Sequence, residues 1–247
     1  MLVGCLLAIT SACTTTRTIS VATLEPNLPA STHDYIRVDE SIGIHQEIHA
    51  YILPYTAKLE EEMSRPLTQN PVALPIGQPE SPLGNLVADL IRLHTRETVG
   101  HHVDLALINW RGLRITLPQG TITVGTVYEL MPFENYFTVL RYSGDQMTRL
   151  FEEIAAYGGE PYSGARMTLR NRQPVDLLIN GEPIDPSRMY WLVTNNWLAD
   201  GGGEMPTLWD YLERIDTGVL IREALIDELS RIDLIHGGLD GRWEELP

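Results

Sequence analysis

Apolar residues recur at helical spacing in four segments of the chain, and these lie in residues 41–63, 81–91, 143–157 and 219–232. In the first segment, Pro54 is expected to kink or restart the helix. The second begins with Ser81 as a helix N-cap and Pro82 at the first helical position. The third is expected to stop at Gly158, where a glycine pair follows the last apolar position.

Shorter apolar runs between these helices have the length and composition of strands, and they cover residues 103–109, 120–124, 136–142, 165–169, 175–179 and 190–195. Residues 125–131 are expected to form a turn or a brief helix. Asn180-Gly181 is the strongest hairpin signal, because both residues tolerate a positive φ. Helices and strands are interspersed without strict βαβ alternation. The pattern therefore favours an α+β fold with mixed or antiparallel β-sheets covered by helices, in a single domain, over a doubly wound fold.

The N-terminus has the pattern of an export signal. Residues 2–9 are apolar but too few to span a bilayer, and Ser11 and Ala12 precede Cys13. This resembles the lipobox of bacterial lipoproteins, which implies that Cys13 is lipidated. We expect residues 1–13 to be a lipoprotein signal peptide and 14–35 a flexible tether rich in Thr, Ser and Pro. The predicted location is the bacterial periplasm or cell envelope, on a lipid anchor. The alternative is an uncleaved hydrophobic N-terminus.

Charge limits the class of partner. The formal net charge is −15, and Lys58 is the one lysine in the sequence, so nucleic acid polymers and anionic lipid surfaces should be repelled. A small nucleotide remains compatible with this charge, because a few local arginines act within a screening length of about 8 Å.

Several familiar catalytic patterns do not fit. His45 and His49 are four residues apart on a predicted helix, but Glu47 is not where the general base of a metalloprotease helix stands. A solvated helix face is the better interpretation. The adjacent histidines His101 and His102 could also be metal ligands, but they are interpreted as structural. No Gly-x-Ser-x-Gly elbow and no phosphate-binding glycine loop occur in the sequence.

Three stretches carry residue types suited to a planar ring that bears a sugar and phosphates, and they are residues 108–114, 131–135 and 195–203. The first offers amide and guanidinium groups, and the third leads from an aromatic ring into a glycine turn. Together with Gly84-Asn85-Leu86-Val87-Ala88-Asp89, these stretches resemble the C-terminal domain of 5'-nucleotidases in order and approximate spacing. The resemblance covers about residues 36–232.

This resemblance implies a four-layer α/β/β/α domain over residues 36–236, followed by a C-terminal tail at 237–247. In the family this domain binds the nucleoside part of the substrate. By resemblance, Phe133 and Trp197 would hold the base between them, Asn135 would contact its edge, and Asn109 with Arg114 would hold the ribose or phosphate side. The glycine-turn residues Asp200, Gly202, Gly203 and Glu204 complete the predicted site.

The sequence departs from the family pattern at three points, one of which is Trp110-Arg111 in place of small glycines. The family usually places an aspartate after two glycines, whereas Gly202-Gly203 is followed by Glu204 here. An arginine customary before Glu80 is replaced within residues 75–78. In the family the aspartate takes ribose hydroxyls, so the pocket is expected to be altered relative to that of an ordinary nucleotide site.

The metal motifs that accompany this domain in the family are absent from the 247 residues: Asp-x-His, Gly-Asp-x-x-Asp, Gly-Asn-His and Gly-His-x-His. Two-metal phosphate hydrolysis needs such ligands. We therefore expect no cofactor in this chain, with divalent metals in a separately encoded metallophosphatase partner. The rival hypotheses are a stand-alone nucleoside-binding lipoprotein that catalyses nothing, and a degenerate structural domain without a ligand.

Overall fold

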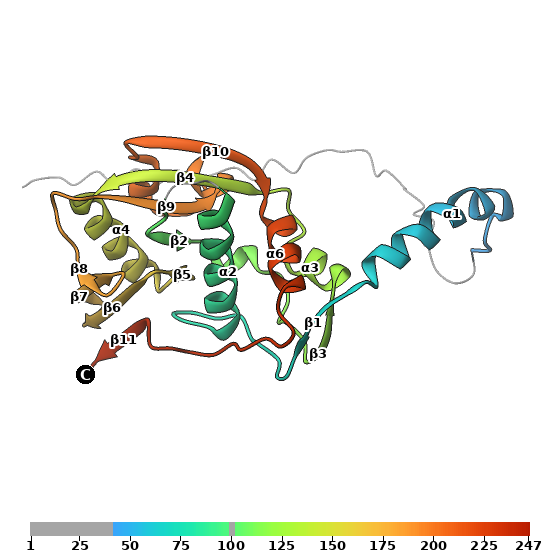
Figure 1. Ribbon diagram of the computed structural model, residues 1–247, viewed down its shortest axis with the longest axis horizontal. Coiled ribbons are helices and arrows are strands. Elements are labelled where there is room, and N and C mark those ends of the chain that lie inside the picture. Colours follow the sequence, from blue (N-terminus) through green and yellow to red (C-terminus); the bar gives the residue numbers. More distant parts are fainter. Residues whose placement is uncertain (1–41, 99–101) are drawn as a thin grey trace, which may run out of the picture. The chain divides into compact units, whose positions relative to one another are not determined.

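The computed structural model describes residues 42–98 and 102–247 (Figure 1). The chain divides into two compact units, Met1–Gln46 and Glu47–Pro247, and the second contains the described strands and helices apart from the first residue of α1. The predicted signal peptide, tether and Cys13 lie outside the described residues. Within the described ranges, no helix combines the length and apolar character that crossing a bilayer requires.

The described helices are α1 Gln46–Met63, α2 Pro82–Thr98, α3 Val124–Leu130, α4 Gly144–Tyr157, α5 Asn196–Ala199 and α6 Ile221–Ser230, with 3-10 turns η1 Trp110–Gly112 and η2 Pro206–Trp209. The predicted caps are present. The hydroxyl of Ser81 accepts the Gly84 N–H at 3.1 Å, and Ser143 forms a capping box with Gln146 at the start of α4. Gly158 ends α4 in the left-handed conformation. In α1, which contains Pro54, no residue is buried.

The described strands are β1 Pro66–Asn70, β2 Leu105–Leu107, β3 Gly120–Thr123, β4 Tyr136–Ser143, β5 Tyr162–Ser163, β6 Ala165–Arg170, β7 Gln173–Ile179, β8 Glu182–Pro183, β9 Met189–Asn195, β10 Glu213–Leu220 and β11 Trp243–Leu246. They form a five-stranded sheet in the order β10-β4-β9-β2-β5, a four-stranded sheet β11-β6-β7-β8 and a β1-β3 pair. Asn180 and Gly181 both have positive φ between β7 and β8, as the predicted hairpin requires.

Two apolar cores lie on the two faces of the five-stranded sheet. Successive residues of a strand point to opposite faces, so Val139 and Val193 pack with α2, α3 and α6, whereas Leu140 and Leu192 pack with α4 and the four-stranded sheet. Both faces of β4 and β9 are therefore buried. This arrangement confirms the predicted α+β class with mixed sheets covered by helices (Figure 1).

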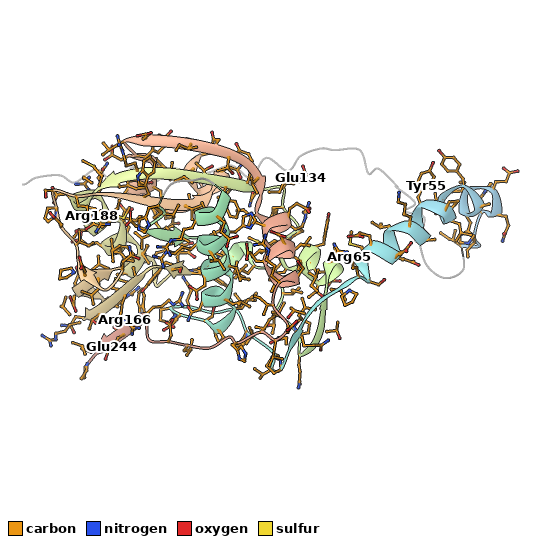
Figure 2. The ribbon with its side chains drawn as sticks, in the orientation of Figure 1. Tyr55, Arg65, Glu134, Arg166, Arg188 and Glu244 are labelled. Carbon is orange, nitrogen blue, oxygen red and sulfur yellow. The ribbon has the colours of Figure 1, made fainter. Side chains whose placement is uncertain are left out.

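The segment 237–247, which the sequence suggested as a tail, belongs to the folded unit. Strand β11 pairs in parallel with β6, and Figure 2 labels one residue on each of these strands, Glu244 and Arg166. Arg242, only 7% exposed, donates to both carboxylate oxygens of Asp89 at 3.1 and 3.0 Å. Residues 237–247 are therefore part of the fold and not a tail, because the buried Arg242 and the pairing of β11 hold them against α2 and β6.

Candidate functional site

The sheet topology brings the three predicted stretches to one edge. β2 and β9 run parallel, with Ala106 opposite Val193, so the segments that follow both strands leave the sheet in the same direction. β4 runs antiparallel to β9, with Phe137 opposite Asn195, so the segment that precedes β4 lies at that same edge. Residues 108–114, 131–135 and 195–203 therefore meet although they are far apart in the chain.

A hydrogen-bonded pair of asparagines fixes the strand ends. The Asn195 Oδ1 atom accepts the Leu198 N–H at 2.8 Å and so caps α5, which identifies the other end of this amide as Nδ2. Asn195 Nδ2 donates to Asn109 Oδ1 at 2.9 Å. Asn109 therefore turns its own Nδ2 donor away from Asn195, and its position depends on the end of β9.

The glycine turn after α5 positions the indole of Trp197. The Gly202 N–H donates to the Trp197 carbonyl at 2.8 Å, and a Cβ added at Gly202 would lie 2.3 Å from the ring atom Cδ2. The backbone thus packs directly on the indole, an approach that only glycine allows. Trp197 is nevertheless 48% exposed, so part of the ring stays open to a ligand.

A cavity of about 280 Å³ lies beside this ring, and it is lined by Asn109, Arg111, Tyr157, Glu160, Trp197, Gly203 and Glu204. Its volume is near the lower end of small-molecule sites, about 300 Å³. A flat aromatic surface, an amide, a guanidinium and two carboxyl groups surround one space. This set suits a planar polar heterocycle better than a purely apolar or purely anionic ligand.

Glu160 is the most deeply buried polar group of the cavity, with 3% of its surface exposed. Burial raises the pKa of its carboxyl to about 7, against the opposing effects of the Trp110 N–H, 2.6 Å from Oε2, and of Arg111. The carboxyl therefore exchanges its proton close to neutral pH.

A pH dependence of stability follows from this pKa. The folded protein binds the Glu160 proton more tightly than the unfolded chain does, so the stabilisation is complete below about pH 4.5 and is lost as the pH rises through about 7. At about 1.4 kcal/mol per pH unit, the loss is on the order of 3 kcal/mol. Urea unfolding of Glu160→Gln, which stays neutral, should lack this fall between pH 4.5 and 7. The exposed neighbour variant Glu152→Gln should keep it, and identical pH profiles for both variants would contradict the assignment.

Of the predicted site residues, Asn109, Trp197, Gly203 and Glu204 line the cavity, and Gly202 supports the indole. Asp200 does not line it; its carboxylate pairs with Arg214 at 2.7 Å. Arg111, Tyr157 and Glu160 also line the cavity and were not among the predicted site residues. A spacing pattern gives no signal for Glu160, because its burial arises only when the α4–β5 connection packs on the end of β2.

Phe133, Arg114 and Asn135 lie at the neighbouring strand end and do not line the cavity. The Arg114 guanidinium carbon is 5.4 Å from the centre of the Phe133 ring, a cation–π contact. Phe133 is 42% exposed, and Asn135 is half-buried, with its carbonyl accepting the Ile221 N–H at 2.9 Å. The Tyr136 N–H donates to Asn196 Oδ1 at 3.1 Å and ties this segment to α5. Their binding roles stay predictions.

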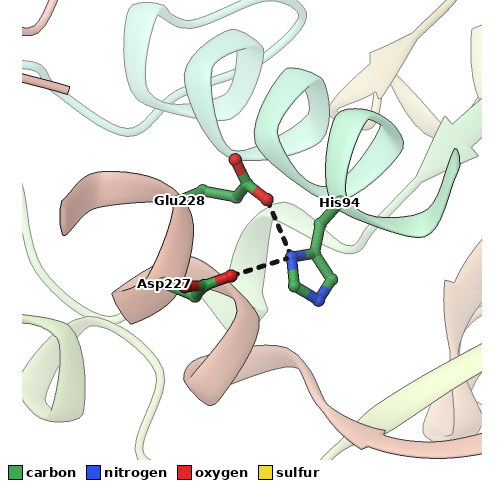
Figure 3. Close-up of side chains that lie close together, drawn as sticks. All are labelled: His94, Asp227 and Glu228. Atoms are coloured by element: carbon green, nitrogen blue, oxygen red, sulfur yellow. Dashed lines mark hydrogen bonds and ion pairs between the residues drawn. The ribbon is translucent and has the colours of Figure 1, made fainter. Parts of the chain in front are cut away.

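Another cluster, His94, Asp227 and Glu228, brings three potential metal ligands within 4.8 Å of one another (Figure 3). His94 Nδ1 lies 2.8 Å from Glu228 Oε1, across the contact between α2 and α6. Arg231 already donates to both carboxylates, at 3.1 Å to Glu228 and 2.7 Å to Asp227. A cation would compete with this guanidinium, so the cluster is interpreted as a polar link between two helices.

The support of Trp197 by Gly202 can be tested separately from folding. In Gly202→Ala, the new methyl group displaces the half-exposed indole, because the ring can move outward while the backbone cannot. The free energy of unfolding should change by less than about 1 kcal/mol, a typical effect at a surface position. Ligand affinity and the fluorescence of Trp197 should change clearly. Gly238→Ala, where nothing lies within 4 Å of the added carbon, is the matched control; equal effects in both variants would count against a supporting role.

Comparison with known proteins identifies the family to which this chain is similar. The model of the 5'-nucleotidase C-terminal domain matches residues 62–210. Human 5'-nucleotidase is 24% identical over 247 residues, covering 87% of this chain and 43% of the human protein. Endonuclease YhcR of Bacillus subtilis is 32% identical over 130 residues, covering 50% of this chain and 10% of the endonuclease.

Among solved structures, the 5'-nucleotidase precursor of Thermus thermophilus superposes with a TM-score of 0.70 at 30% sequence identity, over 81% of this chain and 42% of that one. The chain thus spans less than half the length of these relatives. Because the model of the 5'-nucleotidase C-terminal domain matches residues 62–210, more than half of the chain, the chain belongs to the 5'-nucleotidase family and corresponds to its C-terminal domain.

Proposed function

We propose that this domain recognises a nucleoside or nucleotide in 5'-nucleotidase-type hydrolysis of phosphate esters, as part of nucleotide catabolism. The observation that carries the proposal is the cavity beside Trp197. It combines an indole held by Gly202 with the amide of Asn109 and the buried carboxyl of Glu160. Base–aromatic stacking contributes about 1–3 kcal/mol per base, and the polar groups supply partners for the edge of the base.

The ligand is proposed to lie with its base on Trp197 and with its sugar or phosphate toward Arg111 and Arg114. Phe133 would provide the second aromatic surface, because its segment and Trp197 leave neighbouring strands at the same sheet edge. In that position the base would take the place of the Arg114 guanidinium on the Phe133 ring. Asn135 would then be available to the edge of the base.

Hydrolysis is proposed to depend on a separately encoded metallophosphatase. The metal motifs of the family do not occur in the 247 residues, and two-metal catalysis needs carboxylate and imidazole ligands on both ions. The relatives named above extend well beyond the part that this chain matches. In this proposal, the present domain holds the nucleoside while the partner provides the metals.

The subunit role is tested by purifying the protein together with candidate metallophosphatases from the same genome. Nucleotide hydrolysis is then measured with and without the domain, and with the Trp197→Ala variant. A stable complex and a higher rate that needs Trp197 would support the role. Binding of nucleosides by the isolated domain, with no complex and no change in rate, would instead identify a stand-alone nucleoside-binding lipoprotein.

Export with a lipid anchor is proposed from residues 2–13, and it agrees with the description of the Thermus relative as a precursor. The test is fractionation of cells that express the wild-type protein or Cys13→Ser. The wild-type protein should be in the membrane fraction and should incorporate labelled palmitate, whereas the variant should do neither. Equal distribution of the two proteins would reject the anchor.

A further inference from the structure

The cavity beside Trp197 contains a hydrogen-bond acceptor and a donor that the fold leaves unused. Glu160 Oε2 accepts the Trp110 N–H, but Oε1 makes no hydrogen bond with residues 42–98 or 102–247. Oε1 is also not among the buried polar atoms without a partner, so it keeps some exposed surface, and Glu160 lines both this cavity and a smaller space beside Pro79 and Arg242. A residue that lines the cavity, with only 3% of its surface exposed, thus keeps one carboxylate oxygen without a hydrogen-bond partner among the described residues.

Asn109 supplies the donor. Its Oδ1 atom is taken by Asn195, which is itself fixed by the cap on α5, so Nδ2 is the end left for a ligand. Asn109 Nδ2 likewise makes no hydrogen bond within the described part of the chain. The orientation of both amides is therefore set by the network and not by the ligand. Glu160 and Asn109 line one cavity with the Trp197 ring.

We propose that Glu160 is the specificity-determining residue of this site: its free oxygen accepts an N–H group on the edge of a base that stacks on Trp197, while Asn109 donates to a neighbouring acceptor of the same base. This inference rests on the proposed nucleoside-binding function. It adds which end of the ligand enters the cavity. That end is the base, an uncharged heterocycle with an N–H donor.

Charge supports this orientation of the ligand. Glu160 and Glu204 place two carboxyl groups on the cavity, against one guanidinium, that of Arg111. A phosphate inserted among them would meet like charge, whereas an amino or lactam N–H forms a charge-assisted hydrogen bond with a carboxylate. The phosphate of a nucleotide therefore points out of the cavity. Discrimination is expected, because a ligand without the N–H leaves Glu160 Oε1 without a hydrogen-bond donor while Oε2 keeps the Trp110 N–H.

The test compares adenosine with purine riboside, which has the same ring and sugar but no exocyclic amine. Titration calorimetry is carried out with the full chain at pH 8, above the pKa of about 7 that burial gives the Glu160 carboxyl. The wild-type protein should bind adenosine about tenfold or more tightly than purine riboside, the ratio expected for one hydrogen bond to a charged group. In Glu160→Gln this ratio should fall to roughly fivefold, the level of one neutral hydrogen bond of about 1 kcal/mol.

Glu152→Gln removes the same charge from an exposed position on α4 and should keep the wild-type ratio. Thermal unfolding of Glu160→Gln at pH 5 should match that of the wild-type protein, which shows that the variant is folded. If the wild-type protein binds both nucleosides equally and needs Trp197 to do so, the role of Glu160 is wrong but the proposed function stands. If it binds neither nucleoside, the proposed function is overturned, and this inference with it.

Discussion

Deletion of residues 237–247 is expected to destabilise the protein by about 1–3 kcal/mol, the cost of leaving the buried hydroxyl and carbonyl of Tyr162 without their partners. The deletion removes Arg242, which pairs with Asp89 and Asp240 and donates to the Tyr162 carbonyl at 2.6 Å. It also removes the Arg242 carbonyl that accepts the Tyr162 hydroxyl at 2.6 Å, and it leaves β6 without its parallel partner. Urea unfolding followed by circular dichroism measures the loss.

A shorter deletion separates the contribution of Arg242 to stability from that of strand β11. Removing only residues 244–247 takes away most of β11 but keeps Arg242 and its carboxylate partners. This variant should lose clearly less stability than the longer deletion, since it keeps the buried hydrogen bonds between Arg242 and Tyr162 and loses only an edge strand without buried residues. If the two deletions have the same unfolding midpoint, Arg242 does not hold the C-terminal segment as described.

Replacement of Trp197 by alanine is expected to weaken nucleoside binding by about 1–3 kcal/mol, roughly 5- to 150-fold in Kd. The physical reason is the loss of the stacking surface that Gly202 positions beside Asn109 and Glu160. Because Trp197 is half-exposed and its removal leaves no closed cavity in the core, the free energy of unfolding should change little. Titration calorimetry with adenosine measures the affinity.

Met189→Ala is the matched control for this variant. Met189 is an apolar side chain with 47% exposure at the start of β9, whereas Trp197 follows the end of the same strand and is 48% exposed. Both variants therefore remove exposed apolar surface, but of these two residues only Trp197 lines the cavity. An equal loss of affinity in both variants would show that the effect is not stacking.

Local sequence signals predicted much of the fold. Ser81 and Ser143 cap the helices that follow them, Gly158 ends α4, and Asn180-Gly181 turns between β7 and β8. Each of these features depends on a few neighbouring residues, so a single sequence contains the information. The α+β class followed from their order.

Strands β10 and β11 were not predicted. β10 is an edge strand of the five-stranded sheet with only exposed and half-buried residues, so its pattern lacks a buried face. β11 has no buried residue and is held by β6 and by Arg242. In both cases the backbone partner, rather than the local pattern, makes the strand.

The candidate site was predicted in part, for a similar reason. The resemblance pointed to Asn109, Trp197, Gly203 and Glu204, which line one cavity. It did not indicate that Asp200 pairs with Arg214, that Arg114 lies on Phe133, or that Glu160 is buried beside Trp197. These contacts join residues that are well separated along the chain, and only the folded chain shows them.

The most direct test of the central claim is a nuclear magnetic resonance titration of the isotope-labelled protein with adenosine. The chain has five tryptophans, so the indole N–H signal of Trp197 can be assigned as the one that disappears in Trp197→Phe. If adenosine binds on Trp197 beside Asn109, this signal and the side-chain amide signals of Asn109 should shift with the same saturation curve. Saturable shifts confined to other parts of the protein, or no shift at millimolar adenosine, would contradict this binding mode.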